Sequence, residues 1–426
     1  MKRVISLILC VVSALIFVLS AGGCNGDKDK AEYNGIKQEE YLLGVGNLTS
    51  EQLPAYIDSK VDNQWSADKI GALGAKSTRI WLYLGYYVGR ESKSNNIYLK
   101  QGNCDILHDY IAKMKEQGVE RFMGMIINFI TPFEFNCSDK EALPSAYDDY
   151  DVYVKFLGLM GKTCALLAQE FPEIQYWEIG NEPDIEHASW FHKKGYSGRN
   201  DDEHKFTHDE LAYISADLCW YAYRAIKEIR PEDKVVLPGL VGNPDVLEWI
   251  YKFITQGYLP TAEEYSDRNP DNYFDILCWH VYPTSANEFV KINNEMYQVA
   301  IDYGDEGKPV FLSEFGFSDF RFGGVEAEHQ DLNTEGVQKK NANRAIQCLD
   351  AIKEELPYIE TVFFFRLSNI AQYYDAGSQE NSFGLFYSPN DTDEWASKPK
   401  PIAIELFKYF NGQNADVSVL YKYVVQ

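Results

Sequence analysis

The sequence predicts an α/β fold in which eight parallel strands close into a (β/α)8 barrel. Eight short runs of apolar, β-branched and aromatic residues alternate with amphipathic stretches from residue 41 to about residue 410. Continuous apolar runs are typical of parallel strands that are buried on both faces. An open, doubly wound sheet is the alternative, but "GVGNLTSEQL" after the first run lacks the third glycine of the dinucleotide-binding fingerprint. Eight strands, each followed by a helix, therefore favour a closed barrel of the TIM type.

The expected strands and helices follow one another in alternation. The strand segments are "YLLGVG", "STRIWLYLG", "RFMGMIINF", "IQYWEIG", "KVVLPGL", "FDILCWHVY", "KPVFLSEFG" and "TVFFFRLS". The helical segments cover residues 63–75, 104–117, 148–170, 208–229, 245–256, 286–303, 334–354 and 399–410. Thr207 and Glu210 in "THDE" have the spacing of a capping box, which predicts the start of the fourth helix. The last residues, "DVSVLYKYVVQ", alternate as a strand does, and they predict an extension that either packs against the outside of the barrel or forms part of a small C-terminal β appendage.

Four segments are expected along the chain. Residues 1–24 resemble a bacterial lipoprotein signal peptide, because a basic start and a short apolar stretch precede "SAGGC", in which Cys24 would be lipidated. A plain secretory peptide is the alternative. Residues 25–40 indicate a polar tether, residues 41–410 the (β/α)8 domain and residues 411–426 the strand-like extension. This organisation predicts a lipid-anchored protein of the bacterial cell envelope, facing the periplasm or the cell surface.

The charge balance excludes some partners. Lysine and arginine number 40 and aspartate and glutamate 64, so the net charge is −24, which repels nucleic acid and anionic membranes. We therefore expect membrane contact only through the lipid anchor. No cofactor or metal is expected, because "HKFTH" lacks the glutamate of a zinc-binding helix motif. Most cysteines fall in patterns of buried thiols, and a disulfide between Cys104 and Cys137 is left open.

Polar side chains stand at the ends of several predicted strands. The functional groups of such barrels lie at the carboxyl ends of their strands. The fourth strand runs into Asn181 and Glu182 in "WEIGNEPD", and the seventh ends at Glu314 in "FLSEFGF". The other candidates are His280 and Tyr282 in "CWHVYP" on the sixth strand and Arg79 in "STRIW" on the second. Each could be an ordinary solvated or core residue, but two acids on opposite strands of one barrel mouth are suited to flank a bond.

Two carboxyl groups that flank a bond are what glycoside hydrolysis requires. One must be protonated and give its proton to the departing sugar oxygen, whereas the other must stay ionised and attack the anomeric carbon. A nearby guanidinium and a donor hydroxyl would hold one of them ionised. The sequence therefore predicts a retaining glycoside hydrolase without a cofactor, acting on extracellular or periplasmic poly- or oligosaccharide.

The motifs also resemble those of a known family. "WEIGNEPD", "CWHVYP" and "LSEFGF" are similar to the strand-four, strand-six and strand-seven motifs of glycoside hydrolase clan A, and the likeness is greatest to family 39, the β-xylosidase type. The likeness continues into "FGLFYSPNDTDEWASKPKPIAIELFKYF". It implies that Glu182 is the general acid/base and Glu314 the nucleophile. It further implies that Asn181 binds the sugar's 2-hydroxyl, that Tyr282 and Arg79 hold Glu314, and that His280 lines the same subsite.

Two aromatic positions bear on the sugar-binding surface. Clan A barrels usually carry a tryptophan at the end of the eighth strand as a floor for the sugar, and "FFFRLSN" offers Phe365 there. Trp190, in the long insert after Glu182, could stack on a sugar or pack within its own loop. Two other functions remain open: a non-catalytic glycan-binding barrel of a polysaccharide-uptake system, and a metal-dependent hydrolase or lyase on the same barrel. The intact acids argue against the first, and the shortage of histidines at strand ends argues against the second.

Overall fold

The computed structural model describes residues 41–48, 63–139, 141–185, 191–198, 200–257, 267–319, 335–369, 382–389 and 395–421. The expected signal peptide with Cys24, the expected tether and Trp190 lie outside these residues, and what the sequence indicates about them stays a prediction. Within the described part of the chain, none of the helices combines the length and the apolar character that crossing a bilayer requires.

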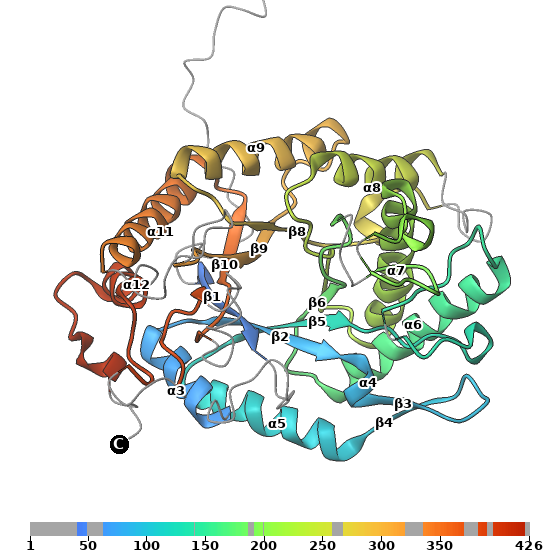
Figure 1. The fold of residues 1–426 in the computed structure, drawn as a ribbon, viewed down its shortest axis with the longest axis horizontal. Coiled ribbons are helices and arrows are strands. Elements are labelled where there is room, and N and C mark those ends of the chain that lie inside the picture. The colour runs from blue at the N-terminus through green and yellow to red at the C-terminus, as the bar shows by residue number, and fades with distance from the viewer. Residues whose placement is uncertain are drawn as a thin grey trace, which may run out of the picture. The chain divides into compact units, whose positions relative to one another are not determined.

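All eight predicted strand segments form strands of one parallel sheet. These strands are β1 (Leu43–Leu48), β2 (Ser77–Tyr83), β5 (Arg121–Ile127), β6 (Tyr176–Ile179), β7 (Lys234–Val236), β8 (Leu277–Val281), β9 (Val310–Phe315) and β10 (Ile359–Phe364). Their order in the sheet is β7-β6-β5-β2-β1-β10-β9-β8. Isolated parallel bridges from Val236 to Ile276 and from Leu240 to Trp279 join its two ends. The predicted (β/α)8 barrel is therefore confirmed, and Figure 1 shows its strands ringed by helices.

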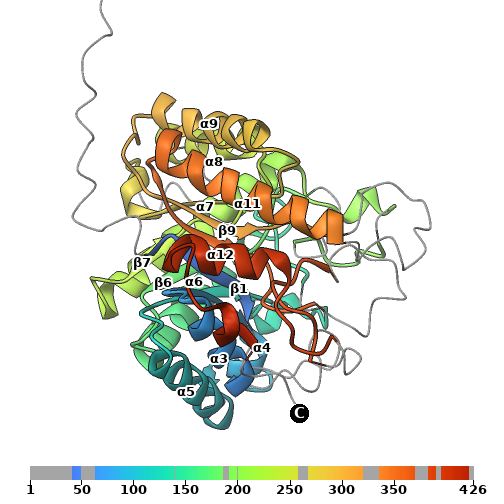
Figure 2. The same cartoon turned by 90° about the vertical axis from the view of Figure 1, so that its left-hand side faces the viewer.

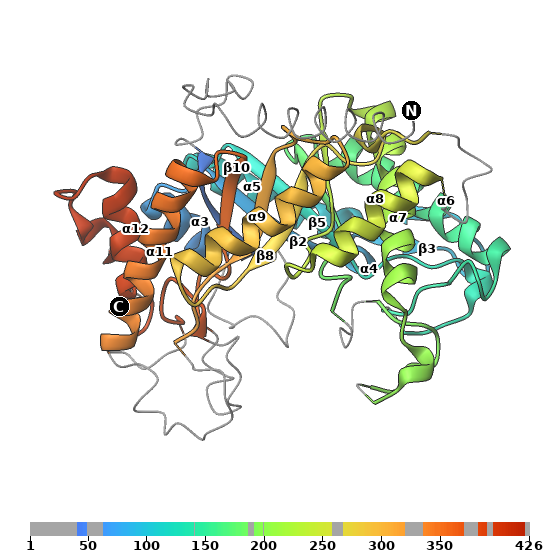
Figure 3. The same cartoon turned by 90° about the horizontal axis from the view of Figure 1, so that it is seen from above.

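A helix follows each strand, as the amphipathic stretches predict. The helices are α3 (Asn63–Leu73), α5 (Gln101–Glu116), α6 (Tyr150–Glu170), α7 (His208–Ile229), α8 (Pro244–Gln256), α9 (Ala286–Asp302), α11 (Glu335–Glu355) and α12 (Pro401–Asn411). Figure 3 shows α9, α8 and α7 following one another along the outside of the barrel. The predicted capping box is present at α7. The Thr207 side chain accepts a hydrogen bond from the Glu210 backbone N–H, and the Glu210 carboxylate accepts one from the Thr207 backbone N–H.

The connection after β2 holds an element that the sequence patterns did not reveal. It begins with the short helix α4 (Leu84–Tyr87) and continues as the antiparallel strands β3 (Val88–Arg90) and β4 (Ile97–Leu99), which extend from the barrel in Figure 1. Such short strands carry too few residues for a clear period of two.

The expected C-terminal β appendage is wrong for the residues that the structure describes there. Residues Val417–Tyr421 form a 3-10 helix beside α3 and α12, seen at the red end of the chain in Figure 2. Leu420 is fully buried, and its carbonyl accepts a 2.9 Å hydrogen bond from Lys69 Nζ on α3. A closed barrel offers no free sheet edge for an added strand, so the alternating pattern buries Leu420 against helices instead. Cys104, which lies within α5, and Cys137 are both free thiols rather than a disulfide.

Candidate active site

The polar strand-end residues meet at one mouth of the barrel because the strands are parallel. His280 lies opposite Glu314 in the ladder between β8 and β9, after a shift of register between Trp279 and His280. Irregularities of this kind re-aim a side chain and are frequent beside active sites. Here the shift brings the imidazole of His280 to the carboxylate of Glu314.

The backbone turns sharply where β6 ends. Gly180 has a φ of 109° and Glu182 a φ of 47°, so both adopt left-handed conformations, which cost a glutamate free energy. The turn is fixed by a parallel bridge between Asn181 and Gly239 and by a 2.8 Å hydrogen bond from the Glu182 N–H to the Gly239 carbonyl. Strain of this kind persists only when the surroundings over-determine it, and it is concentrated at functional sites. The Glu182 side chain remains 16% exposed.

Arg79 contacts two of the candidate residues, and one buried acid that was not predicted, from within β2. Its guanidinium is fully buried and forms a two-point pair with Glu178, with Nε at 2.6 Å and Nη2 at 3.0 Å from the carboxylate oxygens. Nη1 donates to Glu314 Oε1 at 2.7 Å, and Nη2 also donates to Asn181 Oδ1 at 2.8 Å. Burial works to lower the pKa of Arg79, but the charges of Glu178 and Glu314 outweigh it and raise the pKa above its ordinary value. Arg79 is therefore a permanent positive charge beneath the site.

Glu314 is surrounded by groups that favour its ionised form. Tyr282 donates its hydroxyl to Glu314 Oε2 at 2.6 Å, while Arg79 donates to the other oxygen. Burial alone would raise the pKa of Glu314, but the charges of His280 and Arg79 and the two hydrogen bonds lower it below its ordinary value. Burial and the charge of Glu314 raise the pKa of Tyr282 well above its ordinary value, so its hydroxyl stays a donor. A buried carboxylate held ionised in this way is suited to attack an electrophile.

His280 links Glu182 to the interior of the barrel. Its Nδ1 lies 2.8 Å from Glu182 Oε1, and its Nε2 lies 3.0 Å from Ser313 Oγ. Because the Ser313 hydroxyl donates to Glu178 at 3.0 Å, its oxygen is left to accept from an N–H at Nε2. Burial works to lower the pKa of His280, but the charges of Glu314 and Glu182 and the hydrogen bond to Glu182 raise it above its ordinary value. Nδ1 and Glu182 therefore share one proton between them.

The two candidate acids lie close together. One carboxylate oxygen of Glu182, one of Glu314 and a nitrogen of His280 all lie within 4.8 Å of one another. In distance alone, this trio could also hold a metal ion. The donor atoms are already engaged, however, because Arg79 and Tyr282 occupy both oxygens of Glu314. Both nitrogens of His280 likewise have protein partners. The arrangement is better suited to proton transfer and nucleophilic attack than to metal binding.

Aromatic side chains stand beside Glu314 at the mouth. Phe365, at the end of β10, is only 8% exposed and meets the Tyr282 ring edge-on at 5.8 Å between centroids. Phe383, which the sequence patterns did not single out, contacts both rings. Tyr282 as a residue is 39% exposed, so it offers more open surface than Phe365 does. A role for Phe365 as a floor for the sugar stays a prediction.

Comparisons with known proteins agree with this chemistry. Residues 215–385 match a family model described as a glycosyl hydrolase catalytic core. The match and the fold support a clan A glycoside hydrolase, as the motifs predict, and they support the prediction of a glycosidase. No curated protein matches the chain.

Solved structures of glycosidases resemble this chain in fold. A family 39 glycoside hydrolase from Bacteroides cellulosilyticus WH2 has a TM-score of 0.53 at 12% identity over 88% of this chain. The chain spans 66% of the length of that protein. A monomeric β-xylosidase from Caulobacter crescentus CB15 has a TM-score of 0.55 at 14% identity, covering 87% of this chain and 68% of its own. The GH5-4 broad specificity endoglucanase from Clostridium acetobutylicum has a TM-score of 0.55 at 11% identity, covering 88% and 99%.

Three buried polar residues of this candidate site were not among those predicted. Glu178 and Ser313, both fully buried, connect Arg79 to the ring of His280. Asp184, two residues after Glu182, accepts two 2.9 Å hydrogen bonds from the Val241 N–H, and burial raises its pKa to about 7. The sequence did hold a signal for Glu178, because a glutamate inside an apolar strand of a barrel needs a buried positive partner.

Proposed function

We propose that this glycoside hydrolase cleaves its glycan with retention, with Glu314 as the nucleophile and Glu182 as the general acid/base. The observation that carries the proposal is the proximity of the two carboxyl groups, whose nearest offered oxygens lie within 4.8 Å. Retaining enzymes hold these groups roughly 5–5.5 Å apart, whereas inverting enzymes leave about 6.5–9.5 Å for a water molecule. The short separation supports direct attack on the sugar.

The environment of Glu314 supports its role as the nucleophile. Arg79 and Tyr282 each donate a hydrogen bond to it, and its pKa lies below its ordinary value despite its burial. In the first step the ionised Glu314 forms a bond to the anomeric carbon while the bond to the leaving oxygen breaks. The product of that step is a covalent glycosyl-enzyme, in which the Glu314 carboxylate has become an ester.

The contact between Glu182 and His280 supports the role of Glu182 as the general acid. Ser313 and Glu178 hold a proton on Nε2 of His280, so the proton between Nδ1 and Glu182 is available to the leaving oxygen. After that proton has been given up, the ionised Glu182 can take one from the incoming water. His280 thereby acts as a positioning residue that keeps one proton at Glu182.

The residues around the acids support binding of a sugar ring. The side-chain oxygen of Asn181 accepts a hydrogen bond from Arg79. The NH2 group of Asn181 can then donate to a substrate hydroxyl such as the 2-hydroxyl. Tyr282 presents a partly open aromatic face beside Glu314. The similar solved structures include a β-xylosidase and an endoglucanase, so the proposal extends to poly- or oligosaccharide as a class rather than to one sugar. We further propose that the enzyme acts in the cell envelope, anchored through a lipid on Cys24.

The test separates the two acids by their roles. Glu182→Ala should still form the glycosyl-enzyme from an activated aryl glycoside, because that leaving group needs no proton, and then stall until azide is added. Glu314→Ala should fail on activated and natural substrates alike, because it lacks the nucleophile. Glu232→Ala, at a side chain that is 66% exposed on the connection between α7 and β7, is the matched control and should keep wild-type activity.

Two measurements decide the outcome. Product stereochemistry followed by NMR should give the retained anomer for the wild type, and mass spectrometry should detect a glycosyl adduct on Glu182→Ala. An inverted product, or a Glu314→Ala protein that remains active on a natural glycan, would overturn the assignment.

A further inference from the structure

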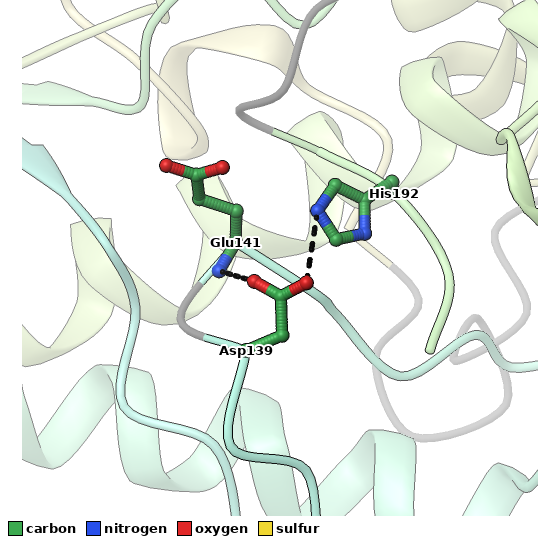
Figure 4. Close-up of side chains that lie close together, drawn as sticks. All are labelled: Asp139, Glu141 and His192. Atoms are coloured by element: carbon green, nitrogen blue, oxygen red, sulfur yellow. Dashed lines mark hydrogen bonds and ion pairs between the residues drawn. The ribbon is translucent and has the colours of Figure 1, made fainter. Parts of the chain in front are cut away.

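A second cluster of acid and imidazole groups lies on two loops at the same end of the barrel. Asp139 and Glu141 belong to the connection after β5, and His192 belongs to the connection after β6, which also carries Glu182. One offered atom from each of the three side chains lies within 4.8 Å of the others. Figure 4 shows the Asp139 carboxylate between the backbone N–H of Glu141 and the ring of His192.

The imidazole of His192 is held in one orientation. It is only 2% exposed and stacks on the Tyr196 ring at 4.5 Å between centroids. Its Nδ1 lies 3.0 Å from the Lys193 carbonyl, which can only accept, so Nδ1 carries the proton of the neutral ring. The lone pair of the neutral ring is then at Nε2. A histidine that binds a metal usually gives its other N–H to a carbonyl or carboxylate in this way.

The Nε2 lone pair faces negative charge. It lies 3.5 Å from Asp139 Oδ2, which is longer than an ordinary N–H···O bond of about 2.7–3.2 Å, with the Glu141 carboxylate nearby. The lysines that follow His192 are engaged elsewhere, since Lys193 pairs with Glu210 and Lys194 donates to a backbone carbonyl. The two carboxylates repel each other, and a cation bound between them and Nε2 relieves this repulsion.

We propose that Asp139, Glu141 and His192 bind a divalent cation, and that zinc is the ion that fits them best. One imidazole and two carboxylates are ligands that zinc accepts, whereas calcium prefers oxygen alone. Bonds of about 2.0–2.1 Å in a tetrahedron place two ligand atoms about 3.3–3.4 Å apart. The 3.5 Å between Nε2 and Asp139 Oδ2 is close to that separation. Glu141 is partly exposed, and its carboxylate offers the third ligand atom within 4.8 Å of the other two.

An ion here would fasten two loops of the barrel mouth to each other. The loops already meet through a bridge between Ala142 and His192 and a 2.9 Å hydrogen bond from the Leu143 N–H to the His192 carbonyl. The neighbouring Phe191 packs against Gly180, immediately before the two catalytic-motif residues Asn181 and Glu182. Zinc would therefore stabilise the loop that delivers the proposed general acid, without taking part in the reaction.

The experiment measures zinc binding to the whole protein. After removal of metals with a chelator, the wild type is dialysed against zinc chloride, and bound zinc and the melting temperature are recorded. We expect one zinc ion whose affinity falls at least about tenfold in Asp139→Asn and in Glu141→Gln, because each isosteric change removes one anionic ligand. The zinc-dependent rise in melting temperature should disappear in both variants.

The control is another histidine with two acids beside it. Glu170 and Glu173 face opposite ring nitrogens of His108, at 3.3 Å and 3.9 Å, so the three cannot share one ion. His108→Gln should therefore bind zinc as the wild type does. The proposal fails if the wild type binds no stoichiometric zinc. It also fails if Asp139→Asn and Glu141→Gln bind zinc with unchanged affinity, which would place the ion at other residues.

Discussion

Tyr282→Phe should move the acidic limb of the pH profile of kcat/KM upward. The substitution removes one atom, the hydroxyl oxygen that lies 2.6 Å from Glu314 Oε2, and leaves the ring contacts in place. In its proposed role as the nucleophile, Glu314 attacks only when ionised, so activity should be lost as the pH falls through the pKa of this carboxyl group. Because the hydroxyl helps to hold that pKa below its ordinary value, its loss raises the pKa and activity is lost at a higher pH.

The size of the shift follows from the strength of the lost bond. A hydrogen bond to a charged group contributes about 1.5–3 kcal/mol, and one pH unit corresponds to about 1.4 kcal/mol. The shift is therefore about 1–2 pH units. The lower end of this range applies because Tyr282 as a residue is 39% exposed and because Arg79 still donates to the other oxygen. Turnover should fall more than ground-state binding weakens, because the lost contact acts on the reacting carboxylate.

The assay is kcat and KM across the pH range with an aryl glycoside that the wild type accepts. Tyr251→Phe is the matched control, because Tyr251 also donates to a carboxylate, Asp305, at 2.6 Å but does so between α8 and the connection after α9. The control can lower stability but should leave the pH profile in place. A Tyr282→Phe enzyme with wild-type turnover and an unmoved acidic limb would refute the placement of this hydroxyl at the nucleophile.

Two further predictions concern the backbone of the site and the anchor. An alanine Cβ at Gly239 would meet Nε2 of His280 and come within 2.8 Å of Ser313 Oγ, so Gly239→Ala should lower the free energy of unfolding by about 1–3 kcal/mol and reduce turnover. The control is Gly158→Ala, whose added Cβ meets no atom within 4 Å and which should lower neither stability nor turnover. A Gly239→Ala protein as active and stable as the wild type would contradict the reasoning. Cys24→Ser should move the protein from the membrane fraction to the soluble fraction, whereas unchanged fractionation would rule out a lipid at Cys24.

The barrel could be predicted from the sequence because its strands differ so strongly from its helices. A parallel strand buried on both faces, such as 121–127, is apolar from its second residue onward, whereas the apolar residues of an amphipathic helix such as 208–229 recur every three to four residues. The same rule placed the candidate acids, since they follow apolar runs whose carboxyl ends share one mouth. The short hairpin after β2 and the last 3-10 helix were missed because a few residues carry no reliable period.

The connections among the buried polar residues could not be predicted in the same way. A strand pattern tells which residues face inward, but not which partner across the barrel each of them contacts. Glu178 contacts Arg79 although the two are 99 residues apart in the sequence. Ser313 contacts His280 beside a register shift that no local sequence pattern predicts. Asp139 and His192 likewise come together only because two long loops fold over the same mouth.

The left-handed backbone at Glu182 makes the residue that favours stability differ from the residue that the proposed reaction needs. Its φ of 47° is a conformation that glycine or asparagine adopts at lower cost, by about 1–2 kcal/mol relative to most other residues. Mutation alone would therefore favour the replacement of this acid, since such a change relieves strain in the folded protein. In the proposed role of Glu182 as the general acid/base, selection for turnover holds the glutamate in place against that pressure. A descendant freed from the need to cleave glycans would become more stable as it lost the acid, and a glycan-binding protein would be the product.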